Sequence, residues 1–204
     1  MTTTAPAAAS LTQPDYLQAK HEAGHRYAQY VATAKPDKQE AWQKIYDQVS
    51  LDPRQQKLLA DFCRDIKVIV VSGTWCGDCV RQGPMIQKIA EAAGATGGGK
   101  VDLKWVDRDE HLDLQQQVKV CGGNRVPVVI FAAEDFELVG YAGDKLLRRY
   151  RIAAAQALGA NCPLPGAPVP QEELDAELQD WVDEFERVHL LLRLSGRLRQ
   201  KHGD

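Results

Sequence analysis

The chain has 204 residues, and its 25 basic and 28 acidic side chains give a formal net charge of −3 at pH 7. That balance argues against a protein that binds nucleic acid or anionic membranes through its overall charge. No apolar run approaches the roughly 20 residues that span a bilayer, and the composition is that of a globular protein with a real core.

The amino-terminal segment, Met1 to Ser10, is rich in small residues and has neither the basic nor the apolar stretch of a secretory signal. We therefore expect a disordered arm over residues 1–12 and a cytoplasmic location. In that compartment the five cysteines should be reduced thiols rather than a structural disulfide framework.

Residues 13–62 predict a helical extension ahead of the core domain. Pro14 and Pro36 suit the first turn of a helix, where the missing N–H donor of proline costs nothing. Asp52, followed by Pro53, is a typical cap of a third helix. The apolar side chains expected to share a face are Tyr16, Ala23, Tyr27 and Tyr30 in the first helix, Trp42, Ile45, Tyr46 and Val49 in the second, and Leu58, Leu59 and Phe62 in the third.

The first of these helices contains His21-Glu22-Ala23-Gly24-His25, which matches the His-Glu-x-x-His pattern of zinc peptidases. On a helix this spacing places both histidines on one face, with Glu22 available as a base and Glu40 as a candidate third ligand. Two glutamines share that face, so we expect it to point to solvent rather than into a cleft. The glycine also weakens the helix. We favour an exposed helix face over a metal site.

A cysteine pair stands in the middle of the chain, in Trp75-Cys76-Gly77-Asp78-Cys79. The preceding β-branched run, Val68 to Ser72, predicts a buried strand, and apolar residues at helical spacing follow from Gly77 to Ala93. Both cysteines therefore lie at a helix N-terminus, whose unpaired N–H groups and positive dipole stabilise an anion. Because the thiolate is the reactive form of cysteine, this segment predicts a redox site.

Strands and helices alternate beyond the cysteines and end in a hairpin and a helix, which is typical of an α/β sandwich with a mixed central sheet. We assign residues 63–158 to this domain. The expected elements are strands over 101–106, 126–131 and 136–141, a helix around Leu112 to Val120, and a helix that Asp144 caps and that ends at Leu158.

Residues 159–204 are expected to form a proline-rich connection and a long C-terminal helix. Asn161 to Pro170 cannot be helical, whereas the acidic start and basic end of the following segment suit a helix dipole. Ser195-Gly196 is expected to end that helix. Its apolar face comprises Leu174, Leu178, Trp181, Val182, Phe185, Val188 and Leu192.

The cysteine segment resembles the active-site segment of the thioredoxin superfamily, in which Trp-Cys-Gly-x-Cys follows a buried strand and a proline, here Pro84, stands five residues later. A second element agrees: Arg125-Val126-Pro127-Val128-Val129-Ile130-Phe131 matches the strand that carries the family's cis proline, at Pro127. Gly143 fits the family's late glycine. The resemblance covers Cys63 to Leu158 and implies a thioredoxin-like three-layer sandwich, extended by helices on either side.

The resemblance also implies an activity, that of a thiol–disulfide oxidoreductase that reduces protein disulfides. Cys76 would attack a substrate disulfide, and Cys79 would resolve the mixed disulfide that forms. Trp75 would cover the pair, and the backbone of Val126, next to a cis Pro127, would accept the substrate as an added strand. Such an exchange needs disulfide-containing protein substrates and an electron donor, which the sequence does not identify, and no cofactor or metal.

Two positions depart from the family. Its best-known members bury an aspartate six residues before the first cysteine and a lysine on the next strand, where this chain has Val70 and Leu103. The usual acid–base partner of the inner cysteine is therefore missing. Asp78 occupies the slot that is commonly proline, and its carboxylate is either the replacement proton acceptor or a cap for the helix N-terminus.

Other interpretations of the cysteine pair stay open. A CxxC pair is also half of a zinc site, but such a site needs two more ligands, and Cys63, Cys121 and Cys162 are isolated in the sequence. A thioredoxin-like fold can also persist without redox activity. Another function is a redox-sensing interaction module, in which the helical extensions bind a partner and the pair oxidises once without turnover.

The remaining reactive side chains are expected to be structural. Cys121 lies six residues before Pro127, and we favour a small buried residue over a third exchanging thiol. His189 falls on the apolar face of the last helix and is expected to be a core histidine. The basic cluster of Arg148, Arg149 and Arg151 is expected to be a solvated helix face.

Overall fold

The computed structural model describes residues 10–158 and 170–204. Most of the arm expected over residues 1–12 and most of the expected proline-rich connection, with Cys162, lie outside the described residues. Within the described ranges, no helix combines the length and the apolar character needed to cross a bilayer.

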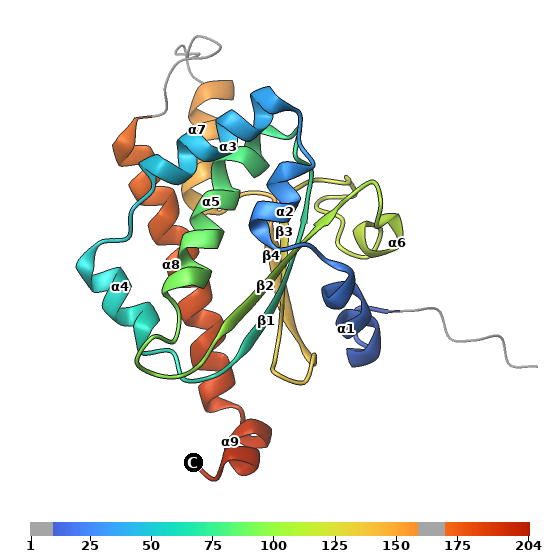
Figure 1. Ribbon diagram of the computed structural model, residues 1–204, viewed down its shortest axis with the longest axis vertical. Helices are drawn as coiled ribbons and strands as arrows, with labels where there is room; N and C mark the ends of the chain where they lie inside the picture. Colours follow the sequence, from blue (N-terminus) through green and yellow to red (C-terminus); the bar gives the residue numbers. More distant parts are fainter. Residues whose placement is uncertain (1–9, 159–169) are drawn as a thin grey trace, which may run out of the picture.

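In the described part of the chain, the strands form a four-stranded mixed sheet in the order β2-β1-β3-β4 (Figure 1). The central strand β1 pairs in parallel with β2 and antiparallel with β3, which in turn pairs antiparallel with β4. The bounds are Ile66–Ser72 for β1, Val101–Asp107 for β2, Val128–Ala132 for β3 and Leu138–Gly143 for β4.

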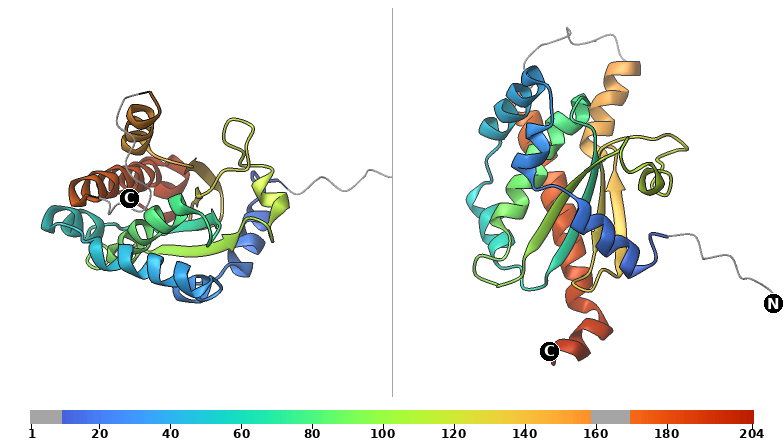
Figure 2. Two further views of the ribbon diagram at one scale, coloured as in Figure 1. Left: turned by 90° about the horizontal axis from the view of Figure 1, so that it is seen from above. Right: turned by 45° about the vertical axis from the view of Figure 1, so that its right-hand side comes forward.

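Helices cover both faces of this sheet (Figures 1 and 2). On one face lie α5 and α8, where the ring of Phe131 in β3 meets Phe185 in α8 at 5.2 Å between centroids. On the other lies α1, whose His21 ring contacts Phe136 at 5.3 Å. The expected α/β three-layer sandwich with helical extensions is therefore confirmed. The helices are α1 Pro14–Ala23, α2 Tyr27–Ala32, α3 Pro36–Gln48, α4 Pro53–Ala60, α5 Gly77–Ala92, α6 Leu112–Gln115, α7 Leu147–Leu158, α8 Gln171–Leu194 and α9 Gly196–His202.

The long helix α8 buries every residue of its expected apolar face. It ends at Leu194 with Ser195 as its cap, as expected, and Ser195 also caps α9, so that the chain continues as a separate short helix. The packing of α8 against α5 and α4 makes this terminal segment part of the core rather than an appendage.

The first predicted helix is interrupted. His25 forms a bridge with Trp105 in β2, with the His25 amide 2.8 Å from the Trp105 carbonyl and the Trp105 amide 2.9 Å from the His25 carbonyl. A Cβ on Gly24 would lie 2.8 Å from that of Lys104, so glycine permits this close approach. As a result α1 buries Leu17 and His21. The prediction that Ala23 lies on the apolar face of this helix is wrong, because Ala23 is exposed.

The helix expected around Leu112 to Val120 is also shorter than predicted, because α6 ends at Gln115. Val120 and Gly123 pair with each other across a two-residue turn. Cys121 and Gly122 at its centre both have positive φ, of 49° and 74°, as a tight hairpin turn requires. Cys121 is therefore exposed on a turn, not buried as expected.

Aromatic side chains from the amino-terminal helices form a cluster behind α5. The Trp42 and Trp105 rings meet edge to face at 5.7 Å, and Tyr30 stacks on Trp105 at 5.6 Å. Gly83 in α5 permits the contact, since a Cβ there would lie only 2.2 Å from the Trp42 ring. The Trp42 indole N–H also donates to the Thr74 carbonyl at 3.3 Å, just before the cysteine pair. The extension thus supports the segment that carries the cysteines.

Candidate redox site

The cysteine pair lies at the start of α5, just after the turn that follows β1. Cys76 is the N-cap residue of α5, and its carbonyl accepts the first helical hydrogen bond, from the Val80 amide at 3.0 Å. Cys79 lies in the first turn. The helix geometry separates the two thiols by exposure: Cys76 is half-buried, whereas the side chain of Cys79 is fully buried.

The two thiols also differ in acidity. The pKa of Cys76 falls to about 6, chiefly because the Cys79 thiol donates to it, with the Cys79 and Asp78 amides adding to the effect. Burial and the charge of Asp78 oppose this shift. The pKa of Cys79 is raised well above its usual value, first by burial and then by the neighbouring Cys76. At neutral pH the outer sulfur is therefore a thiolate and the inner one a thiol.

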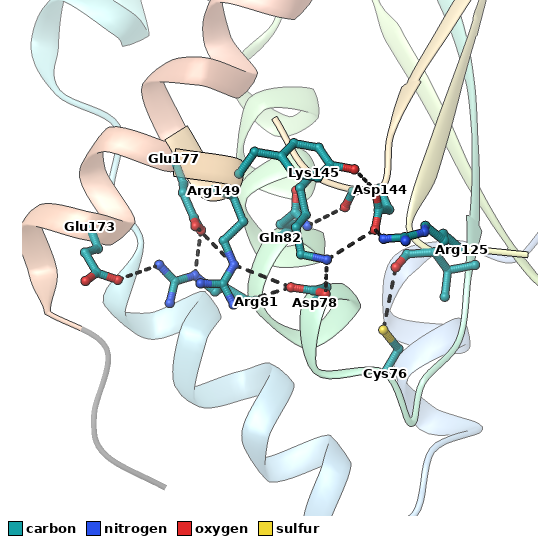
Figure 3. Close-up of polar contacts among 12 residues, drawn as sticks. Cys76, Asp78, Arg81, Gln82, Arg125, Asp144, Lys145, Arg149, Glu173 and Glu177 are labelled. Carbon is teal, nitrogen blue, oxygen red and sulfur yellow. Dashed lines mark hydrogen bonds and ion pairs between the residues drawn. The ribbon is translucent and has the colours of Figure 1, made fainter. Parts of the chain in front are cut away.

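The loop before β3 lies against the outer cysteine. The Val126–Pro127 peptide bond is cis, as the family resemblance implies. Both residues are buried, and the Cys76 Sγ lies 3.6 Å from the Val126 carbonyl oxygen (Figure 3). Trp75 flanks the pair with a ring that is 49% exposed and that stacks under the Arg108 guanidinium at 4.7 Å. The expected site residues Trp75, Cys76, Cys79, Val126 and Pro127 thus gather in one region.

Asp78 is paired with cations. Its carboxylate lies 2.7 Å from Lys145 Nζ and 3.5 Å from Arg149 Nε (Figure 3). The expectation of a fully solvated arginine cluster is therefore wrong for Arg149, which is only partly exposed and faces α5. The charge that Asp78 brings to the helix N-terminus is largely compensated from α7 and the loop before it.

The same lysine belongs to a network that joins α5, α7 and the loop before β3 (Figure 3). Lys145 lies 3.2 Å from the buried carboxylate of Asp144, which also accepts from the Tyr150 hydroxyl and, at 3.3 Å, from Arg125. The Asp144 carbonyl accepts from the Gln82 amide at 2.9 Å. Burial alone would raise the pKa of Asp144, but the hydrogen bonds from Tyr150 and Lys145 lower it.

A buried ion pair lies deeper along α5. Arg81 contacts Glu177 of α8 at 2.6 Å and Glu173 at 3.1 Å, and Arg149 approaches Glu177 at 3.6 Å. Glu177 is only 3% exposed. Burial raises the pKa of Glu177, and Arg81 opposes that rise. This pair fixes α8 against the helix that carries the cysteines.

Sequence reasoning missed Lys145 as a partner of the motif. Its position two residues after Gly143, the family's late glycine, was the available signal. The pairing itself is not visible in the sequence, because Lys145 and Asp78 are far apart along the chain.

The His-Glu-x-x-His segment does not form the arrangement of a peptidase helix. His21 is buried, against the expectation, and its Nε2 lies 2.9 Å from the Asp102 carbonyl oxygen. His25 lies beyond the end of α1 in the bridge to Trp105. The two histidines therefore do not share a helix face.

His189 is a buried core residue, as expected. Its ring stacks on Phe62 at 4.2 Å, and its Nε2 accepts from the Cys63 amide at 3.1 Å. Arg193 lies 2.7 Å from the Cys63 sulfur. These contacts join α8 to the segment that enters β1.

A mixed α/β sheet with a CxxC pair at a helix N-terminus, facing a cis proline, defines the thioredoxin-like class of folds. The family model described as thioredoxin matches residues 24–144, which is more than half of the chain. The chain therefore belongs to the thioredoxin superfamily. The match therefore includes the helices α2 to α6 but not α1, α7, α8 or α9.

Two solved structures share the fold. A protein of unknown function from Pseudomonas aeruginosa has a TM-score of 0.60 at 16% identity, over 81% of this chain and 94% of that one. An HIV epitope-scaffold protein has a TM-score of 0.53 at 17% identity, over 84% and 92% of the two chains. No curated protein matches the sequence.

Proposed function

We propose that this protein is a thiol–disulfide oxidoreductase that reduces disulfides in protein substrates through Cys76 and Cys79. The observation that carries the proposal is the difference in acidity and burial between the two cysteines. Cys76 is an accessible thiolate with a pKa of about 6, and Cys79 beside it is a buried thiol. The attacking cysteine must be an accessible thiolate, whereas the resolving cysteine must stay a buried thiol so that it does not react prematurely.

The exchange proceeds in two displacements. The Cys76 thiolate attacks one sulfur of the substrate disulfide, the S–S bond breaks, and the other substrate sulfur leaves as a thiolate. Cys79 then loses its proton and attacks the Cys76 sulfur, which expels the second substrate thiolate. The two substrate thiolates take up one proton from Cys79 and one from solvent, and the two electrons come from the protein dithiol, which becomes a Cys76–Cys79 disulfide. An external dithiol donor restores the reduced pair.

Val126 and Trp75 are proposed to hold the substrate. The proposal is supported by the position of the Val126 carbonyl beside the Cys76 sulfur, because an extended substrate backbone that pairs with Val126 would bring its disulfide to Cys76. The exposed side chain of Trp75, next to Cys76 in the chain, offers apolar contact to the substrate. A reductase of this kind suits a compartment that keeps thiols reduced, so we place its activity in the cytoplasm.

A second candidate is a redox sensor that binds a partner through its helical extensions. It is favoured by the ion pairs that link α5 to α7 and α8, since these offer a route from the cysteine pair to surfaces outside the core domain. The two functions differ in turnover. A reductase cycles with a dithiol donor, whereas a sensor oxidises once and changes its affinity for the partner.

The test is reduction of a model protein disulfide with a dithiol donor. We expect the full chain to turn over, Cys76→Ser to be inactive, and Cys79→Ser to accumulate a mixed disulfide on Cys76. Activity that persists in Cys76→Ser would overturn the assigned roles, and a single oxidation without turnover would favour the sensor. Identification of the proteins trapped by Cys79→Ser would then name the substrates.

A further inference from the structure

Two buried hydroxyl groups flank the inner cysteine. Ser72 is the last residue of β1 and is 0% exposed, and Tyr30 reaches the same place from α2 with 1% exposed. The Ser72 hydroxyl lies beside both the Cys79 thiol and the Tyr30 hydroxyl, and it lowers the pKa of each. Cys79 thus lies beside the buried hydroxyl of Ser72, which in turn lies beside that of Tyr30.

Neither hydroxyl is satisfied by another polar group in the described part of the chain. Among the described residues, no polar atom meets both the distance and the angle of a hydrogen bond to the Ser72 Oγ or the Tyr30 Oη. Unsatisfied polar groups in a core are uncommon and call for a specific explanation. A hydroxyl can rotate to donate as soon as a suitable acceptor appears.

The acceptor that the proposed reaction creates at this place is the Cys79 thiolate. The carboxylate that would assist in other family members is replaced by Val70, whose side chain is fully buried in the sheet. The charged groups near Tyr30 are the cysteine pair and Asp107, and both raise the pKa of its hydroxyl in addition to burial. Tyr30 therefore keeps its proton and remains a donor.

We propose that Ser72 donates a hydrogen bond to the Cys79 thiolate, that Tyr30 donates to the Ser72 hydroxyl and orients it, and that the two together promote the resolving step. This inference rests on the proposed function. When Cys79 attacks the mixed disulfide, its proton neutralises the substrate thiolate that leaves, and the two hydroxyls retain their own protons. In this arrangement Ser72 would touch the reacting sulfur, and Tyr30 is a positioning residue that acts through Ser72. The N-terminal extension thereby contributes a side chain to the reaction.

The test compares Tyr30→Phe and Ser72→Ala in the full chain. The pKa of Cys79 is measured by thiolate absorbance in a Cys76→Ser background, as the difference from the same protein that also carries Cys79→Ser. A hydrogen bond to an anion is strong enough to shift a pKa by about one unit, so we expect a rise of about one unit for Ser72→Ala and a smaller rise for Tyr30→Phe.

The resolving step is measured in single turnover with a disulfide peptide, by acid quench and mass spectrometry of the mixed disulfide on Cys76. A Cys79 pKa that is one unit higher leaves tenfold less Cys79 thiolate, but each thiolate is more nucleophilic. Resolution should therefore slow about three- to fourfold at neutral pH. Formation of the mixed disulfide should keep its wild-type rate.

Tyr27→Phe is the matched control. Tyr27 belongs to the same aromatic cluster, and its hydroxyl is also buried without a partner among the described residues, but the groups that act on it are Tyr46, Glu91 and Asp47. We expect this variant to leave the Cys79 pKa and the resolving rate unchanged.

An unchanged Cys79 pKa and resolving rate in both test variants would overturn the inference while leaving the proposed function intact. A wild-type chain that forms no mixed disulfide would instead refute the function. In that case the titration of Cys79 still decides whether the hydroxyls contact its thiolate.

Discussion

At the scale of single residues, the chemistry of the site is set by small differences in charge around two sulfur atoms. The helix N-terminus and the Cys79 thiol favour the Cys76 thiolate, while the Asp78 carboxylate opposes it. The cations that pair with Asp78 reduce this opposition. The acidity of Cys76 is therefore a balance that single substitutions should shift in opposite directions.

Alkylation should report the acidity of Cys76 directly. The thiolate is the reactive form, and the pKa is about 6, so the rate of iodoacetamide labelling should rise through pH 6 and level off between about pH 7 and 8. Cys79 should remain unlabelled in the folded protein because it is buried. Peptide mass spectrometry distinguishes the sites, and a Cys76 profile centred near pH 9 would contradict the assignment.

Asp78→Asn should lower the pKa of Cys76 and make the redox potential more oxidising, because it removes a repelling charge and stabilises the reduced form. At ~6 Å in a solvated setting, one charge is worth about 0.7 kcal/mol, or about half a pKa unit. Thiolate titration and a glutathione equilibrium measure both quantities. A higher pKa, or slower release by Cys79 at an unchanged pKa, would mark Asp78 as a proton acceptor.

Lys145→Gln should act in the opposite direction. It leaves the Asp78 carboxylate less compensated, so the pKa of Cys76 should rise by up to about half a unit and the potential should become more reducing. The matched control is Lys88→Gln, which removes a cation from α5, the helix that carries Asp78, where Lys88 lies over the Tyr46 ring instead of beside Asp78. Equal shifts in both variants would indicate a general charge effect rather than the Asp78–Lys145 pair.

At the scale of elements, contact between α5 and the N-terminal helices depends on a glycine. In a helix, Gly83→Ala should be favourable by propensity, but the added Cβ would lie 2.2 Å from the buried Trp42 ring. Overpacking of a core costs about 1 to 3 kcal/mol, which corresponds to a loss of roughly 2 to 10 °C in melting temperature. Gly196→Ala is the control, because a Cβ there meets nothing within 4 Å. A Gly83→Ala protein as stable as wild type would show that α3 and α5 separate easily.

The elements that local patterns specify were predictable from the sequence. A run of β-branched residues predicted β1, and apolar residues at helical spacing predicted the helix after the cysteines and the apolar face of α8. All three predictions were correct. The break between α1 and α2 was not, because it depends on pairing of His25 with a strand far along the chain. The shortening of α6 likewise follows from a tight turn at Cys121-Gly122.

The same distinction holds for the candidate site. The cysteines and Pro127 stand in recognisable local segments, so their proximity was predictable by resemblance. The partners of Asp78 come from a helix whose arginines suggested only a solvated face. Tyr30 was predicted to face the core with its helix, but its approach to Cys79 depends on how α2 packs against β2, and no local pattern contains that information.

At the scale of the whole molecule, a buried ion pair joins the redox helix to the C-terminal helix. Arg81→Met should be strongly destabilising, by about 3 to 5 kcal/mol, because it leaves Glu177 buried without its main cation. Burial already raises the pKa of Glu177 in the folded state. Such a group favours the folded protein below its unfolded pKa and loses that contribution as pH rises, so the variant should lose more stability at pH 8 than at pH 5.

Thermal melts at the two pH values test this expectation. The double variant Arg81→Met/Glu177→Leu is the control, since it removes both charges and should recover much of the lost stability at pH 8. An Arg81→Met protein with the same loss at both pH values would show that Glu177 stays ionised or reaches solvent.

The aromatic cluster behind α5 has a consequence for anyone who would isolate the redox core. A fragment of residues 63–158 would retain both cysteines and Pro127, but the groove at Gly83 and the face of Trp105 would lose the rings that fill them. The exposed apolar surface would be available for self-association. For transplantation into another protein, the smallest useful piece is therefore one that carries α2 and α3 along with the strands.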